Sequence, residues 1–388
     1  MDIRILIDGG IFDGYPHGGI GRAYRELLPR IAESHPEMEF RLLVGKARAE
    51  VLPRHLRVMP WRFEPWNLRP SRLLAWVDRQ RRRKFDRTVQ NWRPDIFQST
   101  YYGMPPFGGM RSVAMVYDLI DAQFPLFMPN GLGFVERQAR VLREADAVVG
   151  ISASTTKAAI ARFGLERSVT ATVHLDASSV FRPLTEESRR AFRQKHVGGH
   201  PFFLFVGSTG SYKNLATLIR AFGRMEGRGG HRLVLAGHGM GRMDSHVFDL
   251  AVKGRVEERI VRLVHPDDEL LCQAYNSATA FVYPSLQEGF GIPLVEAMRC
   301  GTPVVASDIA VFREVCGEAA LYFDPHDHQA LAWQLSQASQ PDARERLVSL
   351  GSERARAFSW DRAADELAQI YLRLAGAARA PAAGSSGR

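Results

Sequence analysis

The sequence predicts an α/β fold made of two doubly wound domains, each with its own parallel sheet. Three observations support this prediction. The chain has 388 residues, which is too many for one ordinary hydrophobic core. Short apolar runs alternate with helical patterns, as they do in βαβ units. This alternation lapses near residues 176–200 and then starts again, so the chain contains two cycles.

The first cycle starts with the apolar run IRILI, which we predict to be a buried strand at residues 3–7. A glycine loop follows it and leads into a helix around residues 20–34. Later strands are predicted at residues 40–44, 95–99, 113–118 and 147–152, with a helix at 135–145.

The second cycle repeats the alternation of apolar strands and helices. Its strands are predicted at residues 202–207, 232–237, 260–264, 280–285, 303–307 and 320–325, and its helices at 214–225, 267–278 and 293–300. We therefore expect an N-terminal domain at residues 1–190 and a second domain at 191–357. A last helix at residues 358–375 is long enough to pack back on the first domain, and the small, polar tail at 376–388 is expected to be disordered.

Composition indicates a soluble globular protein of the cytoplasm. Apolar residues make up 45% of the chain and charged residues 24%, and no apolar run reaches the roughly 18 residues that cross a bilayer. The N-terminus lacks the apolar core and cleavage site of a signal peptide. The three cysteines have spacings that suit neither a disulfide framework nor a zinc site, so we interpret them as small buried residues.

The net charge of +9 is unevenly distributed. Residues 54–93 contain twelve Lys or Arg and only three acids, together with Trp61, Trp66, Trp76 and Trp92. Such a segment can lie on an anionic bilayer surface, which would place the protein at the cytoplasmic face of the inner membrane. The alternative is a solvated helix whose apolar stripe packs on its own domain. No nucleic-acid recognition motif accompanies the charge, so nucleic acid is not an expected partner.

The segment from Glu288 to Glu296, EGFGIPLVE, is the most informative part of the chain. It leaves a strand, turns on Gly289 and Gly291 and enters a helix. Glycines permit close approach of backbone amides, and a helix N-terminus favours an anion such as a diphosphate. The two carboxylates would repel that anion but can accept hydrogen bonds from hydroxyl groups. We therefore predict that Glu296 binds a ribose diol and that Glu288 faces a sugar.

The alternative for these two acids is structural. Glu296 would then complement the helix dipole, and Glu288 would be a solvated loop residue. The glycines and Pro293 at the helix start favour the functional interpretation, and Phe290 and Ile292 complete the predicted donor-binding segment.

Three further loops follow predicted strands, where ligands of open α/β sheets bind. Lys213 precedes a helix and can neutralise a diphosphate, while Ser208 and Thr209 in the same loop can hold phosphate oxygens. Gly18, Gly19 and Gly21 open a helix after the first strand, either as an anion site or as a structural turn. In the first domain a strand-end pair, Tyr117 and Asp118, is either a site element or, for the aspartate, a helix cap.

The block YPSLQEGFGIPLVEAMRCGTPVVASDIAVFREVCGEAALYFDP resembles the signature region of family 4 of the retaining glycosyltransferases. The resemblance implies the GT-B fold, with two Rossmann-like domains facing each other across a cleft. It also implies that Glu288 contacts the hydroxyls of the donor sugar and that Glu296 contacts the nucleotide ribose. The similarity runs over roughly residues 3 to 373.

The same resemblance assigns roles to the other loops. Lys213 matches a family lysine, but the arginine that commonly accompanies it is absent, so Arg22 is a candidate replacement. Gly19 matches the glycine that reaches the donor phosphates. Related enzymes often carry histidine-aspartate where this chain has Tyr117 and Asp118, which makes Asp118 a catalytic candidate and Tyr117 a candidate sugar or acceptor contact.

The resemblance implies a retaining glycosyltransferase. The chain contains no D-x-D triplet, so we predict that the enzyme needs neither a metal ion nor a cofactor. The loops resemble those of bacterial mannosyl- and rhamnosyltransferases of surface polysaccharides, so GDP-mannose is the first choice of donor and a saccharide or lipid-linked saccharide the expected acceptor. Two alternatives remain: a nucleotide-sugar epimerase or phosphorylase on the same fold, and a membrane- or nucleic-acid-binding protein without catalysis.

Overall fold

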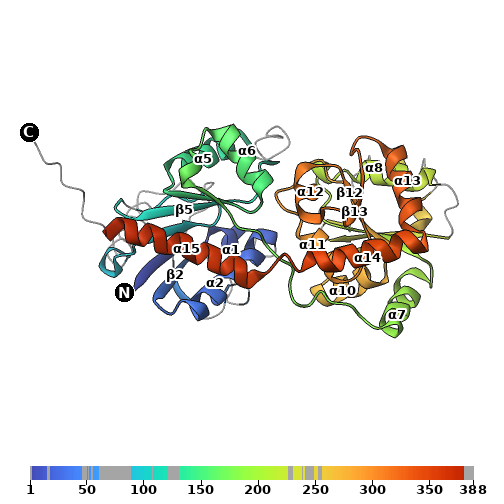
Figure 1. Cartoon of the computed structure of the whole chain (residues 1–388), viewed down its shortest axis with the longest axis horizontal. Coiled ribbons are helices and arrows are strands. Elements are labelled where there is room, and N and C mark those ends of the chain that lie inside the picture. The colour runs from blue at the N-terminus through green and yellow to red at the C-terminus, as the bar shows by residue number, and fades with distance from the viewer. Residues whose placement is uncertain are drawn as a thin grey trace, which may run out of the picture. The chain divides into compact units, whose positions relative to one another are not determined.

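The computed structural model describes residues 2–14, 18–45, 50, 52–53, 56–60, 89–106, 108–120, 131–225, 230–237, 239–240, 249–251 and 256–379. The chain divides into two compact units (Figure 1). The first unit consists of Met1–His174 and Trp360–Arg388, and the second of Leu175–Ser359.

The first unit is built on a parallel sheet of seven strands in the order β3-β2-β1-β4-β5-β6-β7. The strands are β1 Ile3–Asp8, β2 Met38–Val44, β3 Arg57–Pro60, β4 Ile96–Ser99, β5 Arg111–Val116, β6 Ala147–Gly150 and β7 Thr170–Thr172. All five predicted strands are confirmed. The two edge strands β3 and β7 were not predicted, because each has only three or four residues and little burial.

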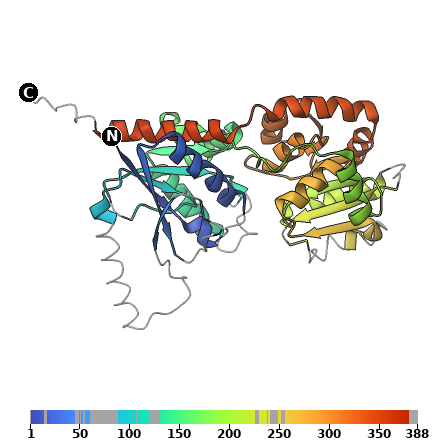
Figure 2. The ribbon, with the colours of Figure 1, turned by 90° about the horizontal axis from the view of Figure 1, so that it is seen from below.

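Helices cover both faces of this sheet (Figure 1). They are α1 Gly10–Gly14, α2 Gly19–Ser34, α5 Gly131–Glu144, α6 Ala153–Phe163 and α15 Trp360–Arg379. The last helix, α15, packs along α2, which Figure 2 shows from another side. The helix reaches Arg379, so residues 376–379 are helical where we predicted a disordered tail, and residues 380–388 lie outside the described part.

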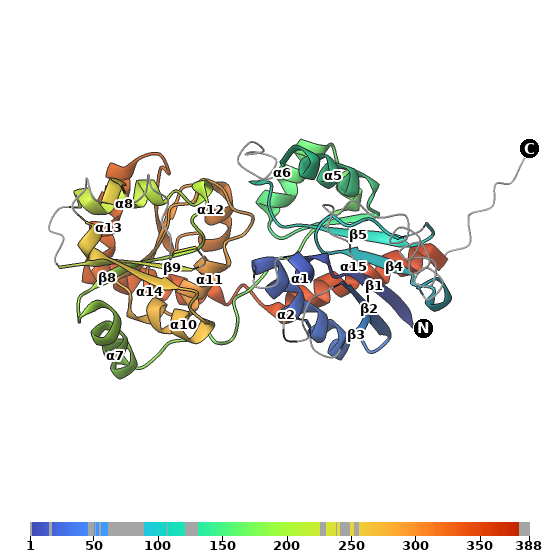
Figure 3. The same ribbon diagram turned by 180° about the vertical axis from the view of Figure 1, so that it is seen from behind.

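The second unit has a parallel sheet of six strands in the order β10-β9-β8-β11-β12-β13. The strands are β8 Phe202–Val206, β9 Arg232–Gly237, β10 Ile260–Val264, β11 Ala280–Tyr283, β12 Val304–Ser307 and β13 Ala320–Phe323. All six were predicted from their apolar runs. The helices are α7 Glu186–Val197, α8 Leu215–Arg224, α10 Asp268–Ser277, α11 Ile292–Arg299, α12 Ala310–Cys316, α13 His328–Ala338 and α14 Pro341–Ala355, and Figure 3 shows α8 and α13 on the face opposite α10 and α11.

Helix α7 occupies the stretch in which the sequence pattern lapsed. It has ordinary end signals, since Thr185 caps its N-terminus by accepting from the Ser188 amide and Gly198 ends it with φ of 64°. Its Phe192 packs against Phe202 of β8, with ring centroids 5.8 Å apart. The helix therefore belongs to the second unit, and the division of the chain lies after His174 rather than after residue 190.

Helix α15 is joined to the first sheet by buried hydrogen bonds as well as by apolar packing. The Tyr371 hydroxyl donates to Gln98 Oε1 at 2.9 Å, and Gln98 Nε2 donates to the Tyr24 hydroxyl at 3.1 Å. The Tyr24 hydroxyl donates in turn to the Ser99 carbonyl on β4 at 3.1 Å. This chain of bonds links α15, β4 and α2 inside the core.

We predict that Tyr371→Phe destabilises the first unit by about 1–3 kcal/mol, because it leaves a buried amide oxygen of Gln98 without its donor. Urea denaturation followed by circular dichroism measures the change. Gln369→Ala on the exposed side of α15 is the control and should leave the transition unchanged. An unaltered transition in Tyr371→Phe would show that the network contributes nothing to stability.

Candidate functional site

The order of strands in the second unit reverses between β8 and β11. In open α/β sheets, ligands bind outside the carboxyl ends of the strands at such a switch point. Here that place is flanked by the loop after β8, residues 207–214, and the loop after β11, residues 284–291. These loops contain most of the predicted donor-binding residues, so the topology brings two separate sequence segments to one edge of the sheet.

The loop after β11 enters α11 through a backbone conformation that requires glycine. Gly291 precedes the helix with φ of 101°, in the left-handed region. A Cβ atom at this position would also lie 2.8 Å from Leu294 Cδ1. Pro293 occupies the first turn, where a missing N–H costs no hydrogen bond. The predicted glycine turn and helix start are thus confirmed as local structure.

Lys213 and Glu288 form an ion pair at the switch point. Lys213 Nζ lies 2.6 Å from Glu288 Oε1 and donates to the Tyr283 hydroxyl at 2.9 Å. Only 10% and 11% of the two charged side chains are exposed. The sequence predicted both residues but assigned them to different parts of a ligand, and only the structure places them in contact.

The charge of Lys213 is stabilised in this position. Burial alone would lower the pKa of Lys213, but the Glu288 carboxylate and the oxygens of Tyr283 and Tyr212 outweigh it and raise that pKa. Burial and the Glu288 charge raise the pKa of the Tyr283 phenol, which stays protonated. The site therefore presents an ammonium group and a carboxylate side by side, a combination suited to a ligand with both phosphate and hydroxyl groups.

Asn214, which the sequence analysis passed over, holds the surrounding loops together. Its Nδ2 donates to the carbonyls of Pro284 and Pro325 at 3.0 and 2.8 Å. Its backbone has φ of 57°, and Thr217 Oγ1 donates to its Oδ1. One side chain thereby connects the loops after β8, β11 and β13. An asparagine directly before an apolar helix was the available signal.

Ser208 and Thr209 lie half-buried in the loop after β8. That loop approaches the end of β9 very closely, since a Cβ on Gly237 would lie 2.0 Å from the Gly207 carbonyl oxygen. The close approach explains why a glycine with φ of 137° occurs there. The predicted phosphate contact of the two hydroxyl side chains stays a prediction.

Glu296 lies one turn inside α11 and is only 4% exposed. Its Oε2 accepts a hydrogen bond of 2.8 Å from the Tyr275 hydroxyl on α10. Burial, together with the Glu296 charge, raises the pKa of Tyr275, so the phenol remains a donor. The structure gives Glu296 a protein partner, and its predicted contact with ribose stays a prediction.

In the first unit, Gly19 is exposed in the first turn of α2 and Arg22 is half-buried in the same turn. The preceding Gly18 provides no side-chain cap. Tyr117 is buried, with its hydroxyl directed at Met115 Sδ and its ring edge-on to Tyr24, which is a core environment rather than a surface that meets a ligand. Asp118 Oδ1 accepts from the Ile120 amide at 3.0 Å, as expected of the capping alternative.

Asp8, at the end of β1, is a buried acid that the sequence analysis did not select. The order of the first sheet reverses between β1 and β4, so this residue also lies at a switch point. Gly10 N–H donates to its Oδ1 at 2.9 Å. Burial raises the pKa of Asp8, while bonds from the Gly10, Thr100 and Tyr101 amides oppose that change. The sequence feature that could have identified Asp8 is a single acid directly after the apolar run IRILI.

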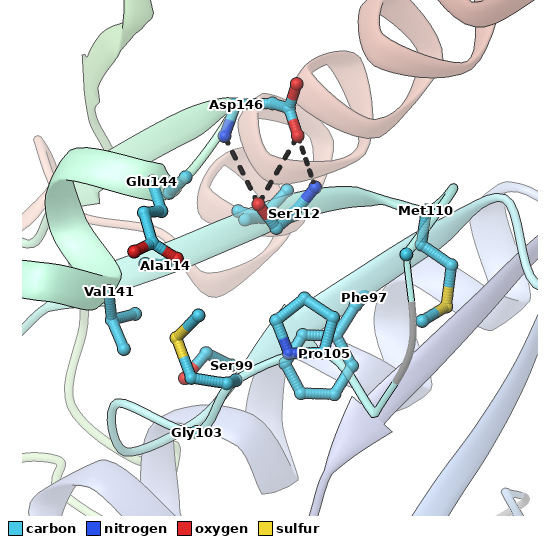
Figure 4. Close-up of a pocket in the computed structure, with 14 residues that line it drawn as sticks. Phe97, Ser99, Gly103, Pro105, Met110, Ser112, Ala114, Val141, Glu144 and Asp146 are labelled. Atoms are coloured by element: carbon cyan, nitrogen blue, oxygen red, sulfur yellow. Dashed lines mark hydrogen bonds between the residues drawn. The ribbon is translucent and has the colours of Figure 1, made fainter. Parts of the chain in front are cut away.

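A cavity of about 270 Å³ lies elsewhere in the first unit (Figure 4). It is lined by β4, β5, the last turn of α5 and residues that join β4 to β5. Most of its walls are apolar, with Phe97, Met110 and Val141 among them. None of the predicted site residues lines it, so the cavity is separate from the predicted donor site.

The basic segment at residues 54–93 lies mostly outside the described residues. One of its four tryptophans, Trp92, is described and is only 7% exposed. Its Nε1 donates to Glu39 Oε2 at 3.1 Å, and the Arg41 guanidinium lies 4.3 Å from its ring centroid. Trp92 therefore belongs to the first unit's core, and the membrane contact predicted for the segment stays a prediction.

Two further findings concern the described residues alone. They contain no helix that is both long and apolar enough to cross a membrane. They also bring together no group of three His, Cys, Asp or Glu side chains that could hold a metal ion.

Comparison with known proteins shows what this chain is similar to. Residues 187–354, which lie within the second unit, match the family described as glycosyl transferases group 1. O-antigen chain mannosyltransferase B of Escherichia coli is 29% identical over 93% of this chain and 97% of its own length.

Two solved structures share the fold of the whole chain. Sucrose-phosphate synthase from Thermosynechococcus elongatus has a TM-score of 0.78 at 20% identity and covers 97% of this chain and 100% of its own. Anabaena HepE in complex with UDP-glucose has a TM-score of 0.72 at 15% identity, with coverage of 97% and 100%. The resemblance inferred from the block YPSLQEGFGIPLVE is confirmed: the chain is a glycosyltransferase with the GT-B fold, and residues 187–354 match the glycosyl transferases group 1 family.

Proposed function

We propose that this enzyme transfers mannose from GDP-mannose, with retention of configuration and without a metal ion, to a saccharide or lipid-linked saccharide of a bacterial surface polysaccharide. The observation that carries the proposal is the ion pair of Lys213 and Glu288 at the switch point, 2.6 Å between charged atoms. The choice of mannose is supported by the similarity to O-antigen chain mannosyltransferase B over nearly the whole chain.

The ion pair suits the two halves of a nucleotide sugar. A diphosphate near the switch point would meet the Lys213 ammonium, which can stabilise the charge that develops as the sugar–phosphate bond breaks. Glu288 is held beside that ammonium and can accept hydrogen bonds from hydroxyls of the transferred sugar. A fixed charge that needs no rearrangement contributes several kcal/mol to such a step.

The remaining donor contacts follow from the same loops. The glycine turn before α11 and the loop with Ser208 and Thr209 would surround the diphosphate, and Glu296 would bind the ribose. In the first unit, Gly19 and Arg22 at the start of α2 would supply further phosphate contacts. Asp118 and Tyr117 are the weaker candidates for contacts with the substrates. Asp118 already accepts a hydrogen bond from the Ile120 amide, and Tyr117 is buried in the core.

In the proposed reaction, the bond between the sugar and the diphosphate breaks first and leaves an oxocarbenium-like sugar. The acceptor hydroxyl then enters from the face that the diphosphate leaves, so configuration is retained without a protein nucleophile. The departing phosphate oxygen takes the acceptor proton. Lys213 and the helix starts would replace a metal ion in stabilising the diphosphate.

A panel of nucleotide sugars tests the proposal directly. The enzyme is incubated with GDP-mannose, UDP-glucose or dTDP-rhamnose and a mannose-terminated acceptor, and the released nucleoside diphosphate is measured. We expect release with GDP-mannose and α-linked product by NMR. Conversion of the donor without release of diphosphate would instead show an epimerase, and binding without turnover a protein that has lost catalysis.

In the same assay, Glu288→Gln and Lys213→Met should each lower kcat about 10²- to 10³-fold, as loss of one oriented charge does in other enzymes. Glutamine preserves the shape of Glu288 and a bond to Lys213, whereas alanine would leave a buried charge unpaired. Glu318→Gln, at an exposed acid of the same unit, is the matched control and should retain full turnover. Full activity in Glu288→Gln would refute the assigned role.

Glu296→Gln should weaken binding of GDP about 10- to 100-fold, because hydrogen bonds to a charged group contribute roughly 1.5–3 kcal/mol. Calorimetric titration measures this change. The 2′,3′-dideoxy analogue of GDP provides the control: it should bind wild-type and Glu296→Gln equally weakly. A loss that is the same for both nucleotides would place Glu296 away from the ribose.

We also propose that the basic segment binds the cytoplasmic face of the inner membrane, on the grounds of its charge alone. Reversal of Arg81, Arg82 and Arg83 to glutamate should lower sedimentation with phosphatidylglycerol vesicles about 100-fold or more, since each basic residue contributes about 1 kcal/mol. Reversal of Lys157, Arg162 and Arg167, which are exposed elsewhere in the first unit, is the control. Equal binding by both triple variants would contradict a specific membrane role.

A further inference from the structure

The chain passes from one unit to the other twice, after His174 and after Ser359. Asp176 and Phe358 are residues of the second unit that each lie one position inside its ends, next to these two passages. Although they are far apart in sequence, both are bound by one side chain, Arg299. All contacts described below lie inside the second unit.

Arg299 binds Asp176 with both arms of its guanidinium group. Its Nε and Nη2 lie 3.0 and 2.6 Å from the two carboxylate oxygens. The Asp176 side chain is only 6% exposed, and the Ala177 amide donates to its Oδ1 at 2.7 Å. A bidentate, partly buried pair of this kind fixes orientation as well as distance. The first connecting segment is therefore held in a defined position.

The second connecting segment is held by the same arginine. Arg299 Nη2 also donates to the Phe358 carbonyl at 3.3 Å. The Phe358 ring packs edge-on against Phe290, with centroids 5.5 Å apart. Phe290 is part of the predicted donor loop and is 2% exposed. The segment thus has two contacts with the EGFG loop and the helix that follows it.

Helix α11 connects the loop that contains Phe290 and the predicted donor residues to Arg299 at its other end. It begins after Gly291, carries Glu296 in its middle and ends at Arg299. With eight residues it is about 12 Å long, and one continuous helix joins the predicted donor loop to Arg299. A change in position at its N-terminus is consequently transmitted to Arg299.

We propose that Arg299 is a positioning residue that couples occupancy of the donor site to the two connecting segments. The inference rests on the proposed donor site. Nucleotide binding at the loop before α11 would restrain that helix, the helix holds Arg299 in place, and the guanidinium fork then restrains both Asp176 and Phe358. Because coupling is reciprocal, restraint of the segments also favours the nucleotide-bound loop.

Hydrogen–deuterium exchange of the full chain, with and without GDP or UDP, tests this coupling. We expect the better-bound nucleotide to slow exchange in the donor loop, residues 286–293, and also in the connecting segments, residues 175–178 and 356–359. The slowing in the segments should be about fivefold or more, the lower range of measured coupling between sites. Arg299→Met should keep the protection of the loop and lose that of the segments.

Arg313→Met is the matched control. Arg313 also forms a bidentate pair, with Asp308 at 2.6 and 2.8 Å, in the same unit but without a bond to either segment. It should behave like wild type. If Arg299→Met does not fold, Asp176→Asn replaces it, because asparagine keeps the shape but removes the charge that orients the fork.

Three results would overturn the inference, and each refutes a different part of it. Protection of the donor loop without protection of the segments in wild type would refute the coupling while leaving the donor site intact. The absence of protection at the donor loop with either nucleotide would refute the proposed donor site, and the coupling with it. Segment protection that persists in Arg299→Met would show that another contact transmits the change.

Discussion

The arrangement of loops at the carboxyl ends of the second unit's strands depends on one constraint: a lysine ammonium is buried in the loop after β8. A charge out of water is costly unless it is paired and hydrogen-bonded. Lys213 is paired with Glu288, which is 75 residues away in the sequence, and donates a further hydrogen bond to the Tyr283 hydroxyl. The ion pair therefore requires two distant loops to meet at the switch point, where an open α/β sheet binds its ligands.

Backbone geometry makes this meeting feasible. Gly237 lets the end of β9 pass against the loop of β8, and Gly291 turns the chain into α11 in a conformation that other residues rarely adopt. Asn214 then binds the carbonyls of two neighbouring loops. Charges, glycines and one amide together fix the edge of the sheet, so that a ligand meets groups that are already in place.

Each unit buries one ionisable side chain near the switch point of its sheet: Asp8 in the first unit and Lys213 in the second. In the first unit the buried carboxylate of Asp8 lies at the switch point and is satisfied by backbone amides of the flanking loops. In the second unit the buried charge is cationic and is paired with the Glu288 carboxylate.

The sequence by itself determined where eleven of the thirteen strands that the structure describes lie, because buried parallel strands are short apolar runs between turn residues. It also predicted the donor segment, because Glu288, the glycines and Glu296 lie within nine residues. It missed α7, whose charged sequence buries only Phe192 and Val197, and hence the true unit boundary. Only the tertiary structure decided that Lys213 pairs with Glu288, that Trp92 and Tyr117 are core residues and that Arg299 binds both connecting segments. The reason is physical: local patterns report burial and turns, whereas these contacts join residues that only the folded sheets bring together.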